Sequence, residues 1–407
     1  MNDTNSSTAK NLAAHVAQRN GQSKVRMGVL LAFVLTIATI VGVRFAGGLS
    51  TTTKPVGDPV HESGMAEYCG VTLQLTNGED CDQYDKLIDE IAAKTSANTI
   101  AMVVFGYQEN CASSSIFIDQ RRTPGKAHLT RLIKHAKSKG LKVTLMPVVL
   151  LENPGQDEWR GKINPDTKWS SWWEDYDNFI MHYADIAQDT GVDILMVGSE
   201  LVSTEKKTED WRSLIQQVRK VYKGHLGYSA NWDHYKVPQF WDDLDIVGMT
   251  TYHELAHKDA RPSVEDLKKK WAELKRGILE WQATVKRPII FTEVAWPNQV
   301  SAAWEPWNYY RSPDKPDAEL QARCFKAFFE TWSNEPAVAG FLIWEWRQGP
   351  DQNVAPDKDT GYVPFGKPAM DVINESFRKA GQDHVATTAP ASQPAEPKPQ
   401  VTVLEPQ

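Results

Sequence analysis

The sequence predicts an α/β fold, a (β/α)8 TIM barrel preceded by one N-terminal transmembrane helix. Three observations lead to this prediction. Short apolar runs alternate with segments of helical periodicity between residues 69 and 380, the runs number eight, and a long uncharged apolar segment precedes them. Strand–helix alternation is typical of a parallel sheet, and eight such units fit a closed barrel. An open doubly wound sheet is the alternative, although no glycine-rich phosphate loop follows any strand.

The N-terminal segment predicts a membrane anchor. Residues 1–26 form a basic leader, with four cations and one acid, and residues 27–43 are uncharged and mostly apolar. That length is close to the roughly 20 residues that cross a bilayer. Positive charge before such a segment keeps the leader in the cytoplasm and sends the remainder across. We therefore expect a single-pass protein of the cell membrane with a periplasmic or extracellular barrel; a cleaved signal peptide is the alternative.

Composition divides the rest of the chain into three parts. Residues 44–64 are rich in Gly, Thr, Ser and Pro and are predicted to be a linker. Residues 65–382 contain the alternating pattern and are assigned to the barrel. Residues 383–407 are rich in Pro, Ala, Thr and Gln, and we expect a disordered tail because they hold too few apolar side chains to fold.

Each barrel unit has a strand candidate and, with one exception, a clear helix. The strands are expected at residues 69–75, 99–105, 142–149, 193–197, 226–230, 246–250, 288–292 and 339–344. The helices are expected at residues 84–95, 128–139, 172–190, 211–222, 264–283, 318–332 and 368–379. Gly140 and Gly191 follow two of these helices, where a C′ glycine ends the helix. Only a weak helix is expected near residues 238–241, between the fifth and sixth strands.

Composition also limits the kind of partner. A formal net charge of -7 gives no electrostatic reason to expect nucleic acid. Fifteen tryptophans are an unusual number, which indicates either a large core or a stacking surface for flat ligands. Because indole rings stack well on the apolar faces of sugars, a carbohydrate partner is one interpretation, and ordinary core packing is the alternative. No cofactor or metal is expected, because no cysteine pair has CxxC spacing and neither His234 nor His253 belongs to a ligand-spaced cluster.

Two strand candidates end in a glutamate, Glu200 after the fourth strand and Glu293 at the end of the seventh. An acid there costs burial free energy unless it is paired or used. Active sites of such barrels lie at the C-terminal ends of the strands. Two carboxyl groups at that end can serve as the acid/base and the nucleophile of a retaining glycosidase. The alternative is that each is a separate structural acid.

Other strand ends add candidate substrate contacts. Asn231 follows the fifth strand and could hydrogen-bond a sugar hydroxyl, and Tyr252 follows the sixth and could donate to the nucleophile. Trp344 or Trp346, at the end of the eighth strand, could form the floor under the reacting sugar. Packing or loop anchoring is the alternative for each of these side chains.

A series of short motifs occurs in a fixed order from about Cys69 to Ala380. They are Trp159-Arg160-Gly161-Lys162-Ile163, Trp172-Trp173 with Tyr176, His182-Tyr183-Ala184, Gly198-Ser199-Glu200-Leu201, Tyr228-Ser229-Ala230-Asn231-Trp232-Asp233, Phe291-Thr292-Glu293-Val294, Pro306-Trp307, Trp344-Glu345-Trp346 and Gly366-Lys367-Pro368-Ala369. With glutamates after strands four and seven, the chain resembles clan A of the glycoside hydrolases and, within it, glycoside hydrolase family 113, known for β-mannanases.

The resemblance implies roles for individual residues. Glu200 would be the acid/base, Glu293 the nucleophile, and Tyr252 the side chain that supports Glu293. Further residues are assigned to the substrate site: Asn231, Trp232, Trp344, Trp346, Arg160 and Trp296. Two positions depart from the pattern. Ser199 stands where many clan members carry Asn, and the third strand ends in Met146-Pro147-Val148-Val149 where a polar motif is expected.

We also expect a disulfide between Cys81 and Cys111. Each cysteine lies in a loop that follows one of the first two strands, so both should lie near the same rim, and disulfides are possible outside the cytoplasm. Two free buried thiols are the alternative. Cys324 lies among Phe325, Phe328 and Phe329 and is expected to be a core thiol.

The expected function is therefore that of an enzyme, a retaining glycoside hydrolase that acts on a β-linked polysaccharide or oligosaccharide. A mannan-like substrate fits the resemblance. Two alternatives stay open: a non-catalytic carbohydrate-binding barrel at the cell surface, and a structural envelope protein. The paired glutamates speak against both, whereas the two departures favour the first.

Overall fold

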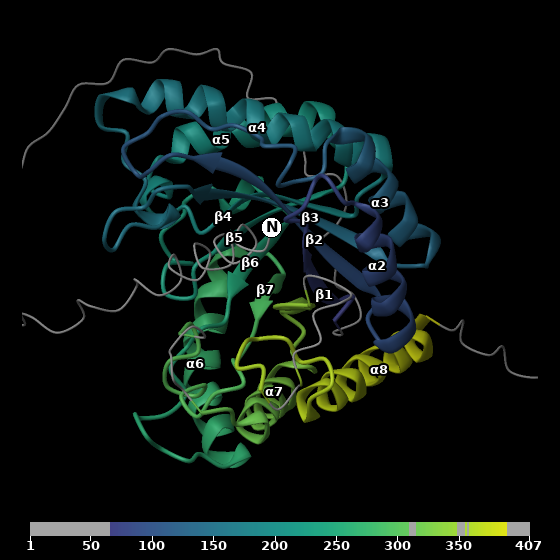
Figure 1. The fold of residues 1–407 in the computed structure, drawn as a ribbon. Helices are drawn as coiled ribbons and strands as arrows, with labels where there is room; N and C mark the ends of the chain where they lie inside the picture. The colour runs from purple at the N-terminus through teal and green to yellow at the C-terminus, as the bar shows by residue number, and fades with distance from the viewer. Residues whose placement is uncertain (1–65, 309–314, 348–354, 356–357, 389–407) are drawn as a thin grey trace, which may run out of the picture.

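The computed structural model describes residues 66–308, 315–347, 355 and 358–388, which form a closed barrel of eight parallel strands (Figure 1). Neighbouring strands pair in sequence order, and β1 pairs with β8 to close the ring. The strands are β1 (Tyr68–Gln74), β2 (Thr99–Gln108), β3 (Lys142–Leu151), β4 (Ile194–Ser199), β5 (His225–Ala230), β6 (Ile246–Thr250), β7 (Ile289–Val294) and β8 (Val338–Ile343). The predicted TIM barrel is confirmed.

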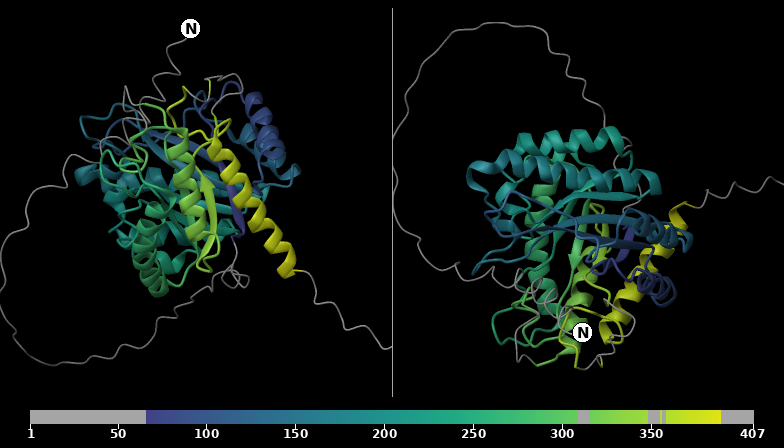
Figure 2. Two further views of the ribbon diagram at one scale, coloured as in Figure 1. Left: turned by 90° about the horizontal axis from the view of Figure 1, so that it is seen from below. Right: turned by 45° about the horizontal axis from the view of Figure 1, so that its top comes forward.

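Seven helices of the described chain surround the strands (Figures 1 and 2). They are α2 (Asp82–Lys94), α3 (Lys126–Ser138), α4 (Trp169–Thr190), α5 (Thr208–Val221), α6 (Val264–Val285), α7 (Ala318–Trp332) and α8 (Pro368–Thr388). Between β5 and β6 the structure has only the short 3-10 turn η5 (Trp241–Asp243). Helix α8 packs on α7, where the rings of Phe377 and Phe329 meet at 5.8 Å.

Local sequence explains where several helices begin and end. Helix α6 starts with a capping box, in which the Ser263 hydroxyl accepts from the Asp266 N–H and the Asp266 carboxylate accepts from the Ser263 N–H. Gly140 and Gly191 have φ values of 80° and 65°, the left-handed backbone that glycine adopts at low cost, so their predicted role as helix stops is confirmed.

Strand alternation divides the apolar side chains into two layers. Along β2, Val103 and Phe105 belong to the cluster inside the barrel, whereas Met102 and Val104 belong to the cluster between strands and helices. The outer layer holds most of the large buried rings, including Trp172, Trp211, Trp271 and Trp332. A rigid double layer of this kind fixes the position of each strand end, where the site is built.

Gly248 lets β6 approach its neighbours closely beneath the site. A Cβ at this position would lie 2.5 Å from the Tyr228 carbonyl oxygen and 3.0 Å from Thr292 Cγ2. With no side chain between them, the hydroxyls of Ser229 on β5 and Thr292 on β7 form a hydrogen bond of 2.7 Å across β6. The three strands that follow β4 are therefore held together just below the ends that carry candidate site residues.

The predicted terminal segments lie mostly outside the described residues. This holds for the leader at 1–26, the transmembrane segment at 27–43 and the linker at 44–64. Among the described helices, none is both long enough and apolar enough to cross a bilayer. Of the tail predicted at residues 383–407, residues 389–407 also lie outside the described residues, whereas residues 383–388 belong to helix α8, which runs to Thr388.

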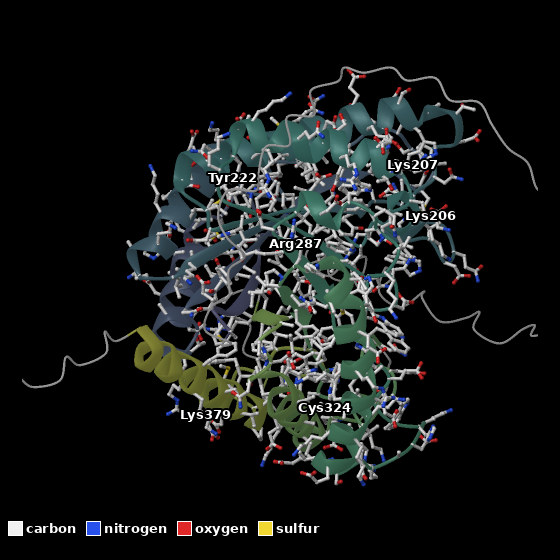
Figure 3. The ribbon with its side chains drawn as sticks, turned by 180° about the vertical axis from the view of Figure 1, so that it is seen from behind. Lys206, Lys207, Tyr222, Arg287, Cys324 and Lys379 are labelled. Carbon is white, nitrogen blue, oxygen red and sulfur yellow. The ribbon has the colours of Figure 1, made fainter. Side chains whose placement is uncertain are left out.

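The predicted disulfide between Cys81 and Cys111 is absent, and both are free, buried thiols. Cys81 precedes α2 and points to the Gly78 carbonyl oxygen at 3.4 Å. Cys111 contacts the segment after β3 instead, with its sulfur 3.5 Å from the Trp159 carbonyl oxygen. The part of this loop that carries Cys111 therefore packs against the segment after β3, and the contact with the loop after β1 lies further along, where the Gly78 N–H donates to the Arg121 carbonyl at 3.0 Å. Cys324 lies buried on α7, as expected for a core thiol (Figure 3).

Candidate active site

Glu293 lies within β7, with a side chain that is only 4% exposed. Its backbone carbonyl accepts from the Thr251 N–H at 3.0 Å, which pairs it with the residue after β6. Its carboxylate accepts a hydrogen bond of 2.7 Å from the Tyr252 hydroxyl. Burial, and next the negative charge of Glu293, raise the pKa of Tyr252 well above its usual range, so the phenol stays protonated and donates.

Glu200 follows the last residue of β4 and is 2% exposed. Its backbone has a φ of 54°, in the left-handed region that non-glycine residues rarely adopt. The Glu200 N–H donates to the Ser229 carbonyl at 2.8 Å, which holds this turn against β5. The carboxylate forms an ion pair of 2.7 Å with Arg160, which is also almost fully buried. Left-handed backbone costs on the order of 1–3 kcal/mol and persists where surrounding contacts impose it.

The two carboxylates converge on the end of β6. Thr250 lies opposite Glu293 in the pairing of β6 with β7, and its hydroxyl is 3.4 Å from Glu200 Oε1. Tyr252, two residues further on, binds Glu293. Tyr252 also lies close enough to Glu200 for that second acid to contribute to its raised pKa, after burial and Glu293. Residues two apart on an extended segment share a face, so both hydroxyls point into the barrel mouth.

A buried cluster behind Glu200 fixes the turn that carries it. The Leu201 N–H donates to the Tyr228 hydroxyl at 3.0 Å, and this hydroxyl donates to Glu205 Oε1, also at 3.0 Å. Glu205 is fully buried, and its second oxygen lies 3.4 Å from His234 Nδ1. Burial raises the pKa of Glu205, although the bond from His234 acts in the opposite direction. The sequence marked Tyr228 only as part of a motif and gave no signal for Glu205.

Three further predicted residues lie beside the two acids. The Asn231 side chain is buried, and its Oδ1 is 3.4 Å from the same Thr250 hydroxyl that contacts Glu200. The backbone N–H of Trp232 donates to the Thr250 hydroxyl at 3.0 Å, and the indole ring of Trp232 lies parallel to that of Trp307 at 6.2 Å. Trp344 belongs to the apolar cluster inside the barrel with Tyr252. Thr250 and Trp307 were missed, although each stood beside a residue or in a motif that the sequence analysis used.

The structure does not bring Trp296 and Trp346 to the site, which corrects their assignment from sequence. Trp296 is fully buried in the outer layer, 5.1 Å from Phe325 on α7. Trp346 is fully buried in the same layer, 5.1 Å from Phe365. Strand β8 ends at Ile343, so the inward direction of Trp344 does not continue by alternation to Trp346. Arg160 does reach the site, where the structure pairs it with Glu200.

The two departures from the family pattern leave an apolar wall on one side of the mouth. Met146, Val148 and Leu150 of β3 point into the interior cluster with Phe105 and Tyr107 of β2. Ser199 is buried, and its hydroxyl has no hydrogen-bond partner among the described residues. Arg160, from the segment after β3, supplies a polar contact that the strand itself lacks. In the described part of the chain, no group of three or more His, Cys, Asp or Glu side chains is placed to hold a metal ion.

Comparison with proteins of known structure agrees with this fold. The β-mannanase AaManA of Alicyclobacillus acidocaldarius, solved in complex with ManMIm, is 26% identical with a TM-score of 0.68, over 78% of this chain and 98% of its own. Another β-1,4-mannanase of glycoside hydrolase family 113 is 26% identical with a TM-score of 0.66, over 77% of this chain and 99% of its own. The endo-β-1,4-mannanase of Thermotoga petrophila, at 10% identity and a TM-score of 0.51 over 78% of this chain and 77% of its own, shares the fold.

The family assignment rests on the sequence as a whole. No curated protein matches the chain significantly. The sequence profile of Glycoside Hydrolase Family 113 matches residues 79–367, well over half of the chain, and this range contains both glutamates and every residue described above at the barrel mouth. The chain therefore belongs to glycoside hydrolase family 113 and is a glycoside hydrolase.

Proposed function

We propose that the chain is a retaining β-mannanase, with Glu293 as the nucleophile and Glu200 as the acid/base. The observation that carries this proposal is the convergence of both buried carboxylates on the hydroxyls of Thr250 and Tyr252 at one strand end. Retaining glycosidases need two carboxyl groups about 5–5.5 Å apart across one bond. The mannan substrate is supported by the family and by two similar structures that are β-mannanases.

The proposed reaction has two steps. In the first, a Glu293 oxygen forms a bond to the anomeric carbon while the glycosidic C–O bond breaks and Glu200 gives its proton to the leaving oxygen. In the second, water attacks the anomeric carbon and gives a proton to Glu200, and Glu293 leaves as a carboxylate. Tyr252 donates to Glu293 and holds it in line for attack. Two inversions at one carbon give net retention.

Hydrolysis of defined polysaccharides tests the substrate. The purified full-length chain is incubated with β-1,4-mannan, β-glucan and xylan, and the anomeric form of the first product is followed by NMR. We expect cleavage of mannan with a β-configured product. Release of an α-configured product would contradict the mechanism. Sugar binding without cleavage of any substrate would favour a binding barrel instead.

Azide rescue tests the two roles separately. With an activated aryl β-mannoside, Glu293→Ala with azide should yield the α-mannosyl azide, because azide replaces the missing nucleophile. Glu200→Ala should instead yield the β-azide, because azide then intercepts the covalent intermediate. Glu280→Gln, on the outer surface of α6, serves as the control that keeps full activity. Products of the opposite configuration would reverse the two assignments.

For location, we propose that residues 27–43 anchor the chain in the membrane with the barrel on the extracytoplasmic side. The basic leader and the uncharged apolar segment support this. Protease added to intact cells or spheroplasts should then digest the barrel and spare the leader. Protection of the barrel until the membrane is broken would contradict the orientation.

A further inference from the structure

The segments that lead into the eight strands form one face of the barrel, which we call the entry face. Because all eight strands are parallel, this face lies opposite the catalytic mouth. Every acid in these segments is paired with a cation: Glu67 with Lys142, Asp193 with Lys137, Asp242 and Asp243 with Arg212, Asp245 with Arg219, and Glu335 with Lys275. The acids of the entry face therefore leave no free negative charge.

Four cations of the entry face have no acidic partner within the described chain. Lys220 and Lys223 lie at the end of α5, just before β5, and both are exposed. Lys286 and Arg287 lie between α6 and β7 (Figure 3). Lys286 is exposed, and the guanidinium of Arg287 donates to three backbone carbonyls and to no carboxylate of the described residues. The sector of the entry face from β5 to β7 therefore carries a surplus of positive charge.

Two of these cations, Lys286 and Arg287, line a hollow of about 260 Å³ between the end of α6 and the turn before β8. This volume is below the range of about 300–1,000 Å³ that is typical of sites for whole small molecules. The adjoining acid, Glu335, is already paired with Lys275 at 2.9 Å. The hollow therefore suits a small anionic group that belongs to a larger assembly, such as the phosphodiester headgroup of a lipid.

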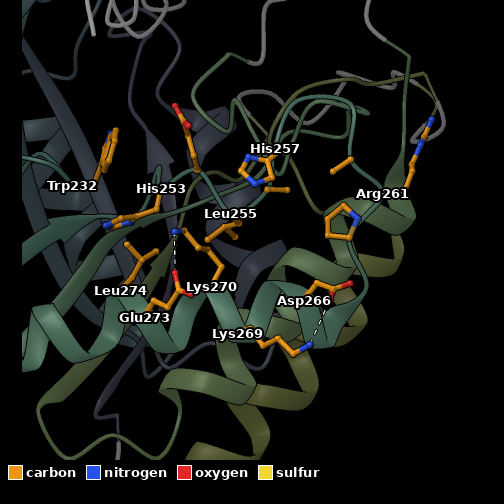
Figure 4. A pocket seen from close by; sticks show the side chains of 14 residues that line it. Trp232, His253, Leu255, His257, Arg261, Asp266, Lys269, Lys270, Glu273 and Leu274 are labelled. Carbon is orange, nitrogen blue, oxygen red and sulfur yellow. Dashed lines mark hydrogen bonds and ion pairs between the residues drawn. The ribbon is translucent and has the colours of Figure 1, made fainter. Parts of the chain in front are cut away.

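The opposite face, around the catalytic mouth, has a different balance of charge. The first turns of α2, α5 and α6 each contain two acids. Beside the first turns of α6 (Figure 4), Lys269 lies 3.8 Å from Asp266, and Lys270 pairs with Glu273 at 3.1 Å. The cations there are matched by acids, so an anionic surface attracts the entry face more strongly than the mouth.

The chain also reaches the barrel at the entry face. Ala66 and Glu67, the first described residues, lead directly into β1. The predicted linker at residues 44–64, which separates them from the apolar segment at 27–43, spans at most about 70 Å when fully extended. In the ring of eight strands, β1 lies opposite β5. The attachment point and the surplus cations are therefore on two sides of the same face, and contacts at both sides fix its orientation.

We propose that the entry face docks on an anionic membrane surface, with a lipid phosphate headgroup in the hollow lined by Lys286 and Arg287. The inference rests on the proposed membrane anchor at residues 27–43. Each Lys or Arg near an anionic bilayer changes the equilibrium between docked and released barrel about fivefold. Docking directs the catalytic mouth away from the bilayer, where a long polymer can reach it.

Energy transfer from the protein to labelled lipids tests the docking in the full-length chain. All four native cysteines are buried, so a fluorophore can be attached at one introduced thiol. Thr284→Cys places it at an exposed position in the last turn of α6, and Ser170→Cys in the first turn of α4 on the mouth side. Each protein is reconstituted in phosphatidylcholine nanodiscs that carry an acceptor on a lipid headgroup. We expect added phosphatidylglycerol to raise transfer from position 284 and not from position 170.

Neutral substitutions test whether the surplus cations cause the docking. The entry-face variant combines Lys220→Gln, Lys223→Gln and Lys286→Gln. The control combines three exposed lysines of the mouth side, Lys168→Gln, Lys206→Gln and Lys258→Gln. The entry-face variant should lower the ratio of docked to released barrel about a hundredfold and remove the effect of phosphatidylglycerol on transfer. The control should retain that effect.

The outcomes separate the docking from the anchor. Incorporation into nanodiscs with equal transfer from position 284 in both lipid mixtures would overturn the docking and leave the anchor in place. Equal loss of transfer in the two lysine variants would also overturn it, because general charge and not the entry face would then be responsible. A full-length chain that does not incorporate into nanodiscs would contradict the anchor and the docking together.

Discussion

Glu293 is part of a paired strand, whereas Glu200 lies one residue beyond the end of its strand with a left-handed backbone. Strand pairing, which shifts register beside Glu293 on both sides of β7, and the hydroxyl of Tyr252 contribute to the orientation of the nucleophile. The acid/base takes its position from Arg160 in a distant segment and from the buried Tyr228–Glu205 contact behind its turn. The nucleophile is thus fixed by the barrel, and the acid/base by side chains collected from several loops. Changes around Glu200 should therefore act through positioning.

The largest expected effect is on stability, from Arg160→Met. This change leaves the buried Glu200 carboxylate without its ion-pair partner, and loss of one member of a buried pair costs about 3–5 kcal/mol. Arg131→Met is the matched control, because Arg131 pairs with Asp82 at the surface, where such pairs contribute at most about 1 kcal/mol. Urea unfolding measures both. Equal losses would show that Glu200 does not depend on Arg160.

Tyr252→Phe should come next, with an effect on rate. It removes a hydrogen bond to an ionised carboxylate, which contributes about 1.5–3 kcal/mol. We expect kcat to fall about 10- to 100-fold with the fold intact, because each 1.36 kcal/mol corresponds to a tenfold change. Steady-state kinetics on mannan, together with the thermal unfolding midpoint, provide the measurement. An unchanged kcat would mean that strand pairing alone suffices to orient Glu293.

Tyr228→Phe should have a smaller effect, of about 5- to 10-fold on kcat, because it removes one neutral hydrogen-bonding group of about 1 kcal/mol behind Glu200. Tyr222→Phe is the control (Figure 3), since that hydroxyl is also buried and donates one hydrogen bond, to the backbone carbonyl of Val192, but far from the site. Both variants should lose similar stability, and only Tyr228→Phe should lose kcat. A similar kcat in the two variants would rule out the positioning role.

The smallest expected effect concerns pH and Glu205. Burial raises the pKa of Glu205 in the folded chain, so its neutral form is favoured there. Its contribution to stability is complete below the unfolded-state pKa of about 4.3 and is lost as pH rises through the raised folded-state value. Glu205→Gln removes this dependence. The difference in unfolding midpoint between wild type and variant should therefore decrease from pH 4 upward, and a constant difference would contradict the assignment.

The same contrast explains what the sequence could predict. Glu293 and Tyr252 were found because each ends an apolar run, and strand ends of a barrel meet at one face. Arg160 was placed in the site only by resemblance, and Glu205 not at all, since their contacts join segments whose relative positions depend on the folded loops. Trp296 and Trp346 were misplaced because adjacency to a catalytic residue in sequence says little about direction once the strand has ended. The predicted Cys81–Cys111 disulfide was wrong because both cysteines lie in loops, and the strand pattern does not determine the course of a loop.

The partial exposure of Trp232, beside the catalytic centre, has a practical consequence. Most rings of the outer layer, such as Trp172, Trp211 and Trp332, are sealed from water. Trp232 is partly exposed and lies beside Thr250 and Glu200, where the proposed function expects a carbohydrate to displace solvent. Its fluorescence is therefore an intrinsic optical signal of occupancy against a constant background. Titration of the catalytically inactive Glu293→Gln protein with oligosaccharides can be read from this signal without any label.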